Sequence, residues 1–283
     1  MHDIRFIDKT FDLSQTHLYH LTIQISLDGI YFTVLDIPKG KYILLQGHHF
    51  FLKRPRLLLK HIRDVFESEE VLRSDFKSVE ILYSTRKFTL VPQTFYTRNS
   101  ADKFMWFNNI QERGFALLKN SLPKAECWCI FDIPQNLSDF LAEKFPKIVI
   151  RHNLFPLIEG VLKRNRPHSD RSQAHLNFFR ENFEMVVING TKLIYCNMFN
   201  FKVDRDILYQ VLFAFDQLKL STEETELFIH GQLPPVSSVY HLFKKYVKST
   251  FFARLDTTYQ YSYTFSQLPE HYYSSLLSAY KCE

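Results

Sequence analysis

Apolar and polar residues alternate most regularly within residues 18–50, and this pattern predicts three strands. In residues 21–27 the two kinds of side chain alternate one by one, which is the period of a strand with one buried face. Asp28-Gly29 then separates two hydrophobic runs, a strong signal for a tight hairpin turn. A second turn at residues 38–40 leads into the apolar run 42–45. We therefore predict an antiparallel three-stranded meander.

The rest of the first half alternates between helical and extended patterns. Pro55 begins a helix in which Leu58, Ile62, Val65 and Phe66 fall on one face. The further elements that we predict are a strand at 78–83, an extended segment at 88–97, a helix at 101–118, a strand at 126–132 and a helix that begins at Pro134. The predicted order is βββαβαβα.

The same order is predicted again in the second half. The expected elements are strands at 174–179, 183–188 and 192–199, a helix at 203–218, a strand at 226–230, a helix at 236–247, a strand at 250–255 and a helix from Pro269. A short strand at 147–150 and a helix at 154–163 lie between the halves, and a polar, basic loop at 164–172 precedes the second meander. We predict an α/β protein with one lobe at residues 1–150 and the other at 151–283.

Several segments resemble a known family. They are HLTIQISLDG (20–29), KLIYCNMFNF (192–201), DILY (206–209), QL (217–218) and IHG (229–231). On these segments the chain resembles an uncharacterised bacterial family, of the Bacteroidetes type, whose domain has no assigned function and has the actin-like ATPase fold. The resemblance covers nearly the whole chain from about Thr16. It implies two ribonuclease-H-like lobes that face each other across a cleft.

The resemblance also implies where a nucleotide would bind. In active actin-like proteins the phosphates lie between the first hairpin turns of the two lobes, in the pattern Asp-x-Gly-x-Gly-Thr. Here the first turn keeps Asp28 and Gly29, whereas the second, Arg180-Glu181-Asn182, has no glycine. Backbone amides approach phosphate closely where glycine leaves room for them. The second turn therefore departs from the family pattern.

Two further positions correspond to the family's nucleotide site. Asn153 begins the helix that usually starts with a catalytic polar residue, but an amide cannot accept a proton from water as a carboxylate does. Gly231 stands alone where the superfamily has a Gly-Gly pair near adenosine. If a nucleotide binds, we expect Asp28, Gly29, Asn153 and Gly231 to hold it. The whole chain has seven glycines, so we expect neither a catalytic residue nor a metal ligand, and we interpret Asp28 as a turn residue.

Composition narrows the class of protein. Hydrophobic residues make up 46% of the chain and aromatic residues 16%, which is typical of a folded domain. No apolar run reaches the length of a membrane span and the first thirty residues lack a signal-peptide layout, so we expect a cytoplasmic protein. Cys127 and Cys129 form a C-x-C pair within a predicted strand, and we expect buried, reduced thiols there.

Three functions remain open after these observations. We favour a non-catalytic adaptor or scaffold with a degenerate nucleotide site, no required cofactor and an unidentified cytoplasmic protein partner. The first alternative is a weak ATPase that binds ATP with Mg²⁺. The second is association with nucleic acid through the basic stretches 53–56 and 163–166, although the net charge of +5 is small for this chain and acidic residues follow the first stretch closely.

Overall fold

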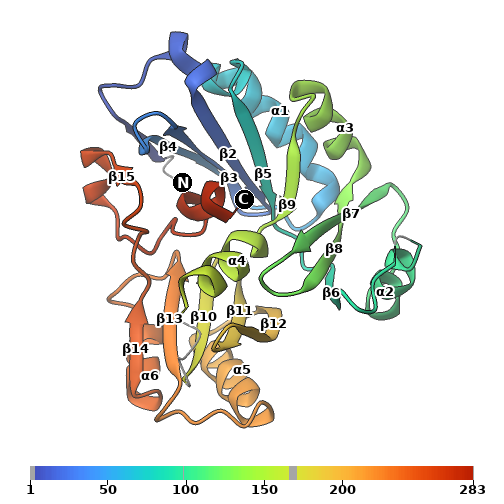
Figure 1. Ribbon diagram of the computed structural model, residues 1–283, viewed down its shortest axis with the longest axis vertical. Coiled ribbons are helices and arrows are strands. Elements are labelled where there is room, and N and C mark those ends of the chain that lie inside the picture. The colour runs from blue at the N-terminus through green and yellow to red at the C-terminus, as the bar shows by residue number, and fades with distance from the viewer. Residues whose placement is uncertain (1–3, 98, 166–170, 283) are drawn as a thin grey trace.

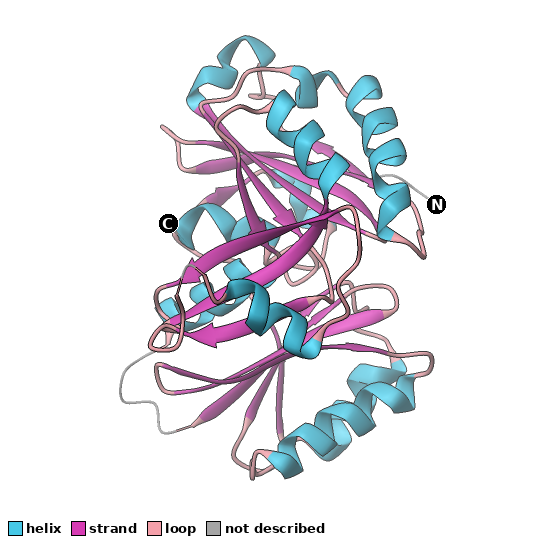
Figure 2. Ribbon diagram, turned by 90° about the vertical axis from the view of Figure 1, so that its right-hand side faces the viewer, coloured by secondary structure: helices cyan, strands magenta, loops and turns pink. Residues whose placement is uncertain are grey.

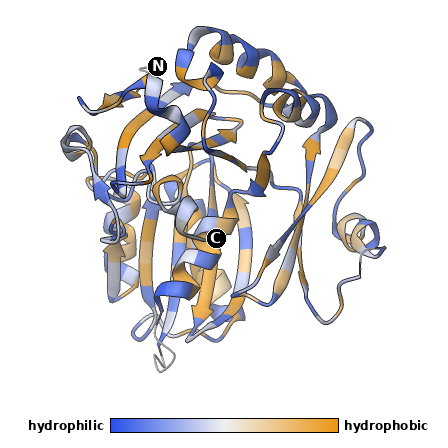
Figure 3. Ribbon diagram, turned by 45° about the horizontal axis from the view of Figure 1, so that its top comes forward, coloured by the Kyte–Doolittle hydropathy of each residue, from blue (hydrophilic) through white to orange (hydrophobic). Residues whose placement is uncertain are grey.

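Two large β-sheets, with helices on their outer sides, form the body of the protein (Figure 1 and Figure 2). The computed structural model describes residues 4–97, 99–165 and 171–282, so most of the loop predicted at 164–172 lies outside the described residues. In Figure 3 hydrophobic colour runs along the strands of the sheets, and the outer helices carry both colours. No helix within the described residues has the length and apolar character needed to cross a bilayer.

The first sheet has seven strands and contains the N-terminal meander. Its order is β1 (Ile4–Ile7), β4 (Lys41–His49), β3 (Gly29–Asp36), β2 (Tyr19–Ser26), β5 (Ser78–Tyr83) and β9 (Val149–His152), and β15 (Gln260–Tyr261) also pairs with β4. The pairs β2–β3 and β3–β4 are antiparallel, whereas β5 and β9 continue the sheet in parallel with β2. The meander predicted in residues 18–50 is confirmed.

Two helices cover the outer face of the first sheet. Leu58, Ile62, Val65 and Phe66 of α1 (Leu58–Ser68) are buried, as their helical spacing predicts. The neighbouring α3 (Gln135–Lys144) packs against α1, with the rings of Phe66 and Phe140 5.4 Å apart. Short 3-10 segments lie at Leu13–Leu18, Pro55–Leu57 and Glu70–Arg73.

The second sheet also opens with an antiparallel meander. Its order is β12 (Lys192–Asn200), β11 (Asn182–Asn189), β10 (Ser172–Phe178), β13 (Glu226–Gly231) and β14 (Ser249–Phe252). The last two strands pair in parallel, β13 with β10 and β14 with β13. The helices α5 (Asp204–Gln217) and α6 (Ser238–Tyr246) contribute Ile207, Val211, Phe215, Val239 and Phe243 to the core of this lobe.

A separate three-stranded sheet follows β5, and here two predictions are wrong. The sheet has the order β6 (Phe88–Pro92), β8 (Cys127–Pro134), β7 (Phe115–Leu122), with α2 (Ala101–Asn108) beside it. The helix predicted at 101–118 ends at Asn108, and Phe115–Leu122 is a strand paired with β8. Gly114 lies between them with φ +81°. A short apolar run fits a helix or a strand equally well, and pairing with β8 decides for the strand.

The strand predicted at 126–132 does form, but not in the first sheet. It is β8 of the separate sheet, and the strand that pairs with β5 in the first sheet is β9, close to the short strand predicted at 147–150. The first lobe therefore completes the order βββαβαβα with α1, β5, α3, β9 and α4 (Leu154–Arg164). Periodicity could not assign β8 to a sheet, because it describes the faces of a strand and not its neighbours.

Two central segments join the lobes (Figure 1). The first, α4, is buried from Leu154 to Leu162 and contacts β11 and β12. The second is the C-terminal chain, which returns to the first sheet, where Phe265, Tyr273 and Leu276 share a core with residues of β3 and β4. The α-helix predicted from Pro269 is wrong. Turns precede a 3-10 helix at Leu276–Cys282, and another 3-10 segment lies at Tyr263–Gln267.

Candidate functional site

The first hairpin turns of the two sheets meet through Asp28. The backbone N–H of Arg180, in the turn between β10 and β11, donates a hydrogen bond to Asp28 Oδ2 at 3.2 Å. The Arg180 guanidinium lies over the ring of Phe51 with its central carbon 4.9 Å from the ring centroid. Burial raises the pKa of Asp28, although the Arg180 hydrogen bond opposes the shift. The carboxylate expected near phosphates thus contacts the opposite turn directly.

Gly29 lies where two strands approach closely. A Cβ atom at this position would lie 2.6 Å from the carbonyl oxygen of His48, on the neighbouring strand β4. No side chain fits there without displacing backbone. Packing of β3 on β4 is therefore enough to require glycine at this position.

Asn153 is the centre of a buried hydrogen-bond network between the lobes. Its Oδ1 accepts from Gln24 Nε2 on β2 at 2.7 Å. Its Nδ2 donates to both carboxylate oxygens of Glu184 on β11, at 3.1 and 3.2 Å. Asn177 Nδ2 on β10 donates to Glu184 Oε2 at 2.8 Å. The amide of Asn153 thus binds one residue from each lobe.

Glu184 is a residue that sequence analysis missed. It is fully buried, and burial raises its pKa to about 7, although the hydrogen bonds from Asn177 and Asn153 favour the ionised form. A buried carboxylate without donors costs several kcal/mol, so the two amides make this position tolerable. The available signal was a single acidic residue within the apolar strand FEMVVI (183–188).

Gly231 lies at the end of β13 with φ +76°, a conformation that disfavours other residues. A Cβ atom there would lie 2.2 Å from the carbonyl oxygen and 2.5 Å from the nitrogen of Phe178. The N–H of Gly231 donates to the carbonyl oxygen of His271 in the C-terminal segment at 2.8 Å. Both the strand packing and this backbone conformation require glycine.

The space between the predicted site residues is small. Asp28 and Gly231 line one cavity of about 20 Å³, together with Gln24, Tyr272 and Tyr273. This volume is on the scale of one water molecule. Gly29 and Asn153 are not among the residues that line it. The structure thus brings Asp28 and Gly231 together and places the other two predicted residues outside this cavity.

Larger cavities flank the small one. On one side a cavity of about 500 Å³ is lined by Asp28, Arg180, Asp204, Gln232 and Ser237, among others. On the other side a cavity of about 380 Å³ reaches from Asp28 to the three-stranded sheet.

The second of these flanking cavities contains a perturbed carboxyl group. Burial raises the pKa of Asp132, which ends β8, to about 6, while the nearby Lys87 opposes the shift. Its Oδ1 accepts from the hydroxyl of Thr85 at 3.3 Å. The carboxyl group of Asp132 can therefore exchange a proton near neutral pH.

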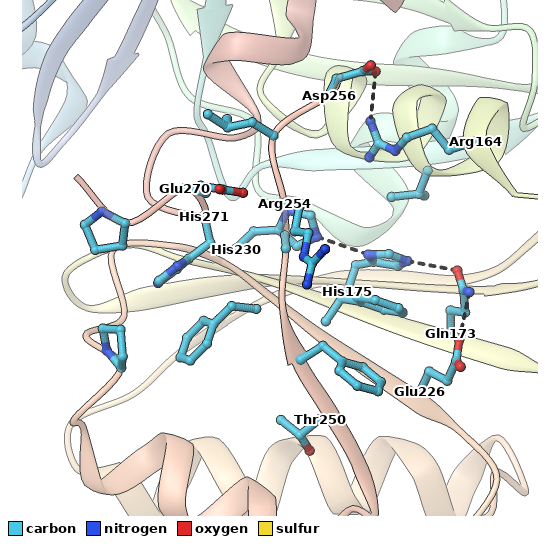
Figure 4. Close-up of a pocket in the computed structure, with 18 of the residues that line it drawn as sticks. Arg164, Gln173, His175, Glu226, His230, Thr250, Arg254, Asp256, Glu270 and His271 are labelled. Atoms are coloured by element: carbon cyan, nitrogen blue, oxygen red, sulfur yellow. Dashed lines mark hydrogen bonds and ion pairs between the residues drawn. The ribbon is translucent and has the colours of Figure 1, made fainter. Parts of the chain in front are cut away.

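A cavity of about 1100 Å³ lies on the second lobe between β10, β13, β14, the end of α4 and the C-terminal segment (Figure 4). His175 Nδ1 lies 3.1 Å from His230 Nε2, and His230 Nδ1 lies 3.0 Å from the hydroxyl of Ser274. Burial lowers the pKa of His175 to about 3 and also lowers that of His230, so both rings are neutral at physiological pH.

The remaining candidates from the sequence are metal-binding groups, the paired cysteines and the basic stretch 163–166. Within the described part of the chain, no three His, Cys, Asp or Glu residues are arranged to bind a metal ion. Burial raises the pKa of Cys127 to about 12 and that of Cys129 well above its usual value. In the basic stretch 163–166, Arg164 lies 3.9 Å from Asp256, and Arg166 lies outside the described residues.

Two sheets that each open with an antiparallel meander, joined by central segments, define a protein with the actin-like ATPase fold. The solved structure of a Bacteroides thetaiotaomicron protein with this fold and unknown function superimposes with a TM-score of 0.77 at 21% identity, covering 86% of this chain and 94% of that one. The PilM-PilN type IV pilus biogenesis complex gives a TM-score of 0.59 at 14% identity, covering 93% of this chain and 98% of that one.

The family is shown by the sequence as well. Residues 8–250 match the family described as "Protein of unknown function (DUF3822)", and the chain belongs to this family. No curated protein matches the chain. The resemblance to an uncharacterised family with the actin-like ATPase fold is therefore confirmed.

Proposed function

We propose that this protein is a non-catalytic scaffold or adaptor that holds a cytoplasmic protein partner and does not turn over ATP. The observation that carries the proposal is the direct contact between the two first turns, where Arg180 donates to Asp28, together with the small cavity of about 20 Å³ that Asp28 shares with Gly231. Small-molecule sites occupy roughly 300 Å³ or more. A nucleotide bound beside both Asp28 and Gly231 would have to displace residues that line this small cavity, such as Tyr272 or Tyr273.

The hydrogen-bond network around Asn153 supports a fixed arrangement of the lobes. Opening the lobes would separate Gln24 from Asn153 or Asn153 from Glu184, and would leave buried polar groups without partners. Enzymes that close on a nucleotide need low-cost domain movement. A protein that presents a constant surface to a partner does not need such movement.

Exposed apolar side chains support protein binding. Phe95, Phe107 and Ile110, next to or within α2 beside the three-stranded sheet, are 67%, 86% and 82% exposed. Exposed large apolar side chains that gather in one region are typical of interaction surfaces. The neighbour whose solved structure is the PilM-PilN complex supports the same function by analogy.

Calorimetric titration with Mg-ATP tests the proposal. We expect no heat of binding at nucleotide concentrations up to about 1 mM, and no phosphate release. A pull-down from the native cytoplasm with the wild type, compared with a Phe107→Ser variant, should yield a partner that the variant retains less well. Micromolar binding of Mg-ATP, with turnover that is lost in Asp28→Ala and kept in Asp102→Ala, would contradict the adaptor function. Asp102 is the matched control because it is also an aspartate but lies at the start of α2, away from the hairpin turns at Asp28 and Arg180.

A weak ATPase is the second candidate, and the cavity of about 500 Å³ beside Asp28 and Arg180 favours it. Its volume suits a nucleoside, and Ser237 and Gln232 offer polar groups. The titration above separates the two functions. A Ser237→Ala variant with weakened nucleotide binding would place the base in this cavity.

A further inference from the structure

The edge strand β14 runs along the cavity of about 1100 Å³ and has one unpaired edge among the described residues. In the second sheet β14 pairs with β13, and no other strand of the described residues pairs with it. The N–H of Ala253 donates to the carbonyl oxygen of Ile229 on β13 at 2.8 Å. In a strand, alternate residues direct their backbone groups to opposite edges. Thr250 and Phe252 therefore direct their N–H and C=O groups away from β13.

Stacked rings lie on both faces of this strand. On one face the rings of His175, Phe228 and Phe251 follow one another across three strands, with centroid distances of 4.9 and 5.6 Å. On the other face Phe252 lies between Tyr240 of α6 and His271, at 4.4 and 4.2 Å. Phe251 is 46% exposed. A strand added to the open edge would place alternate side chains beside Phe251 and beside Phe252.

Charged side chains line the cavity along the open edge. Lys244, which is on α6 and hence on the Phe252 face, and Arg254 both line the cavity, and neither has a carboxylate at ion-pair distance among the described residues. The other cation of the lining, Arg164, pairs with Asp256, and Glu226 pairs with Arg171. Glu270 is the third acidic residue that lines the cavity, after Glu226 and Asp256. The cations Lys244 and Arg254 that line the cavity along this edge favour acidic side chains in a bound segment.

The geometry points to a peptide-binding site: we infer that an extended segment of a partner protein binds β14 as a sixth strand of the second sheet. Its apolar or aromatic side chains contact the Phe251 face, and its acidic side chains contact Lys244 and Arg254. Main-chain hydrogen bonds supply affinity in such strand addition and alternate side chains supply specificity. The inference rests on the proposed adaptor function, because it names the class of partner segment that the adaptor holds.

A synthetic peptide tests the inference by fluorescence anisotropy. The probe is a fluorescein-labelled Thr-Glu-Phe-Glu-Val-Glu-Thr peptide, whose apolar and acidic residues alternate. We expect saturable binding below about 1 mM, and at least about tenfold weaker binding when every peptide nitrogen is methylated or when each Glu is replaced by Lys. Equal binding of the methylated peptide, or no binding of the unmodified one, overturns the inference.

Two protein variants complete the test. Phe251→Ser should weaken binding about tenfold or more, because the ring that covers the apolar side chains is lost. Phe213→Ser is the matched control, since Phe213 lies on α5, is 52% exposed and does not line the cavity. Equal loss in both variants also overturns the inference. If neither the probe nor Mg-ATP binds, the peptide site is contradicted and the adaptor function is not. If Mg-ATP is turned over while the probe still binds, the adaptor function is contradicted and the peptide site is not.

Discussion

Asn153, the residue before the first turn of α4, donates its side-chain amide to the fully buried carboxylate of Glu184 on β11, at 3.1 and 3.2 Å. The same amide accepts from Gln24 of the first sheet. One side chain thus holds groups from both lobes in a buried region, where an unsatisfied partner is costly. Asn153, which the resemblance would place at the usual catalytic position, thus connects the lobes.

Removal of the Asn153 amide should destabilise the protein. Asn153→Ala leaves Gln24 Nε2 without an acceptor and Glu184 with only one donor, Asn177. We expect a loss of roughly 1–3 kcal/mol in the free energy of unfolding, measured by urea denaturation. Asn120→Ala is a useful comparison, because Asn120 also bonds backbone groups of β9 but does not cross between the lobes. A stability change below about 0.5 kcal/mol in Asn153→Ala would show that the network contributes little.

Glu184 should make stability fall as pH rises. Its pKa is raised to about 7 in the folded protein from an ordinary 4.5, so the folded state binds the proton more tightly than the unfolded chain. This contribution is lost as pH rises from about 4.5 through about 7. Glu184→Gln cannot ionise, and its stability relative to the wild type should therefore increase by roughly 2.5 kcal/mol between pH 5 and pH 8. A difference between the two proteins that is independent of pH would contradict the raised pKa.

His152 should make the stability of the protein fall as pH decreases. Its Nε2 donates to the carbonyl oxygen of Thr85 at 2.8 Å, and its Nδ1 accepts from the N–H of Leu154 at 3.1 Å, so the neutral ring is fixed. Burial lowers its pKa to about 4. The unfolded chain binds this proton near pH 6.5, so the contribution to stability is complete above that pH and is lost as pH falls toward 4.

Proton NMR of the imidazole resonances measures the pKa of His152 directly. The His152 resonance, assigned by its disappearance in His152→Gln, should not titrate between pH 8 and about pH 5. Titration of His152 above pH 6 would mean that the ring is not enclosed as described.

Glycine should be required at residue 231 and not at residue 40. Both have positive φ, +76° and +57°, but a Cβ at Gly231 would lie 2.2 Å from Phe178 O, whereas nothing lies within 4 Å of a Cβ at Gly40. Gly231→Ala should cost more than about 2 kcal/mol, and Gly40→Ala about 1 kcal/mol, in thermal or urea unfolding. Equal costs in the two variants would show that φ alone, and not the contact with β10, requires glycine at residue 231.

Local pattern in the sequence was enough to predict the elements in which apolar side chains alternate with polar ones or recur at helical spacing. Alternation and the Asp28-Gly29 turn predicted β2, β3 and β4, and helical spacing predicted the buried face of α1 with the correct residues. The short family segments predicted the fold that the solved neighbours share. These signals can be read from nearby residues in the chain, because side chains return to the same face of a strand every two residues and of a helix every 3.6 residues.

Only the tertiary structure decided which elements meet. Phe115–Leu122 became a strand because β8 lies beside it, and the C-terminal segment returned to the first sheet, where Tyr273 and Leu276 fill its core. Gln24 and Asn153 are 129 residues apart in sequence, and Glu184 comes from a third element, so no periodicity could predict their contact. A side chain's partner depends on which surfaces pack in three dimensions, whereas its periodicity describes only the face on which it lies.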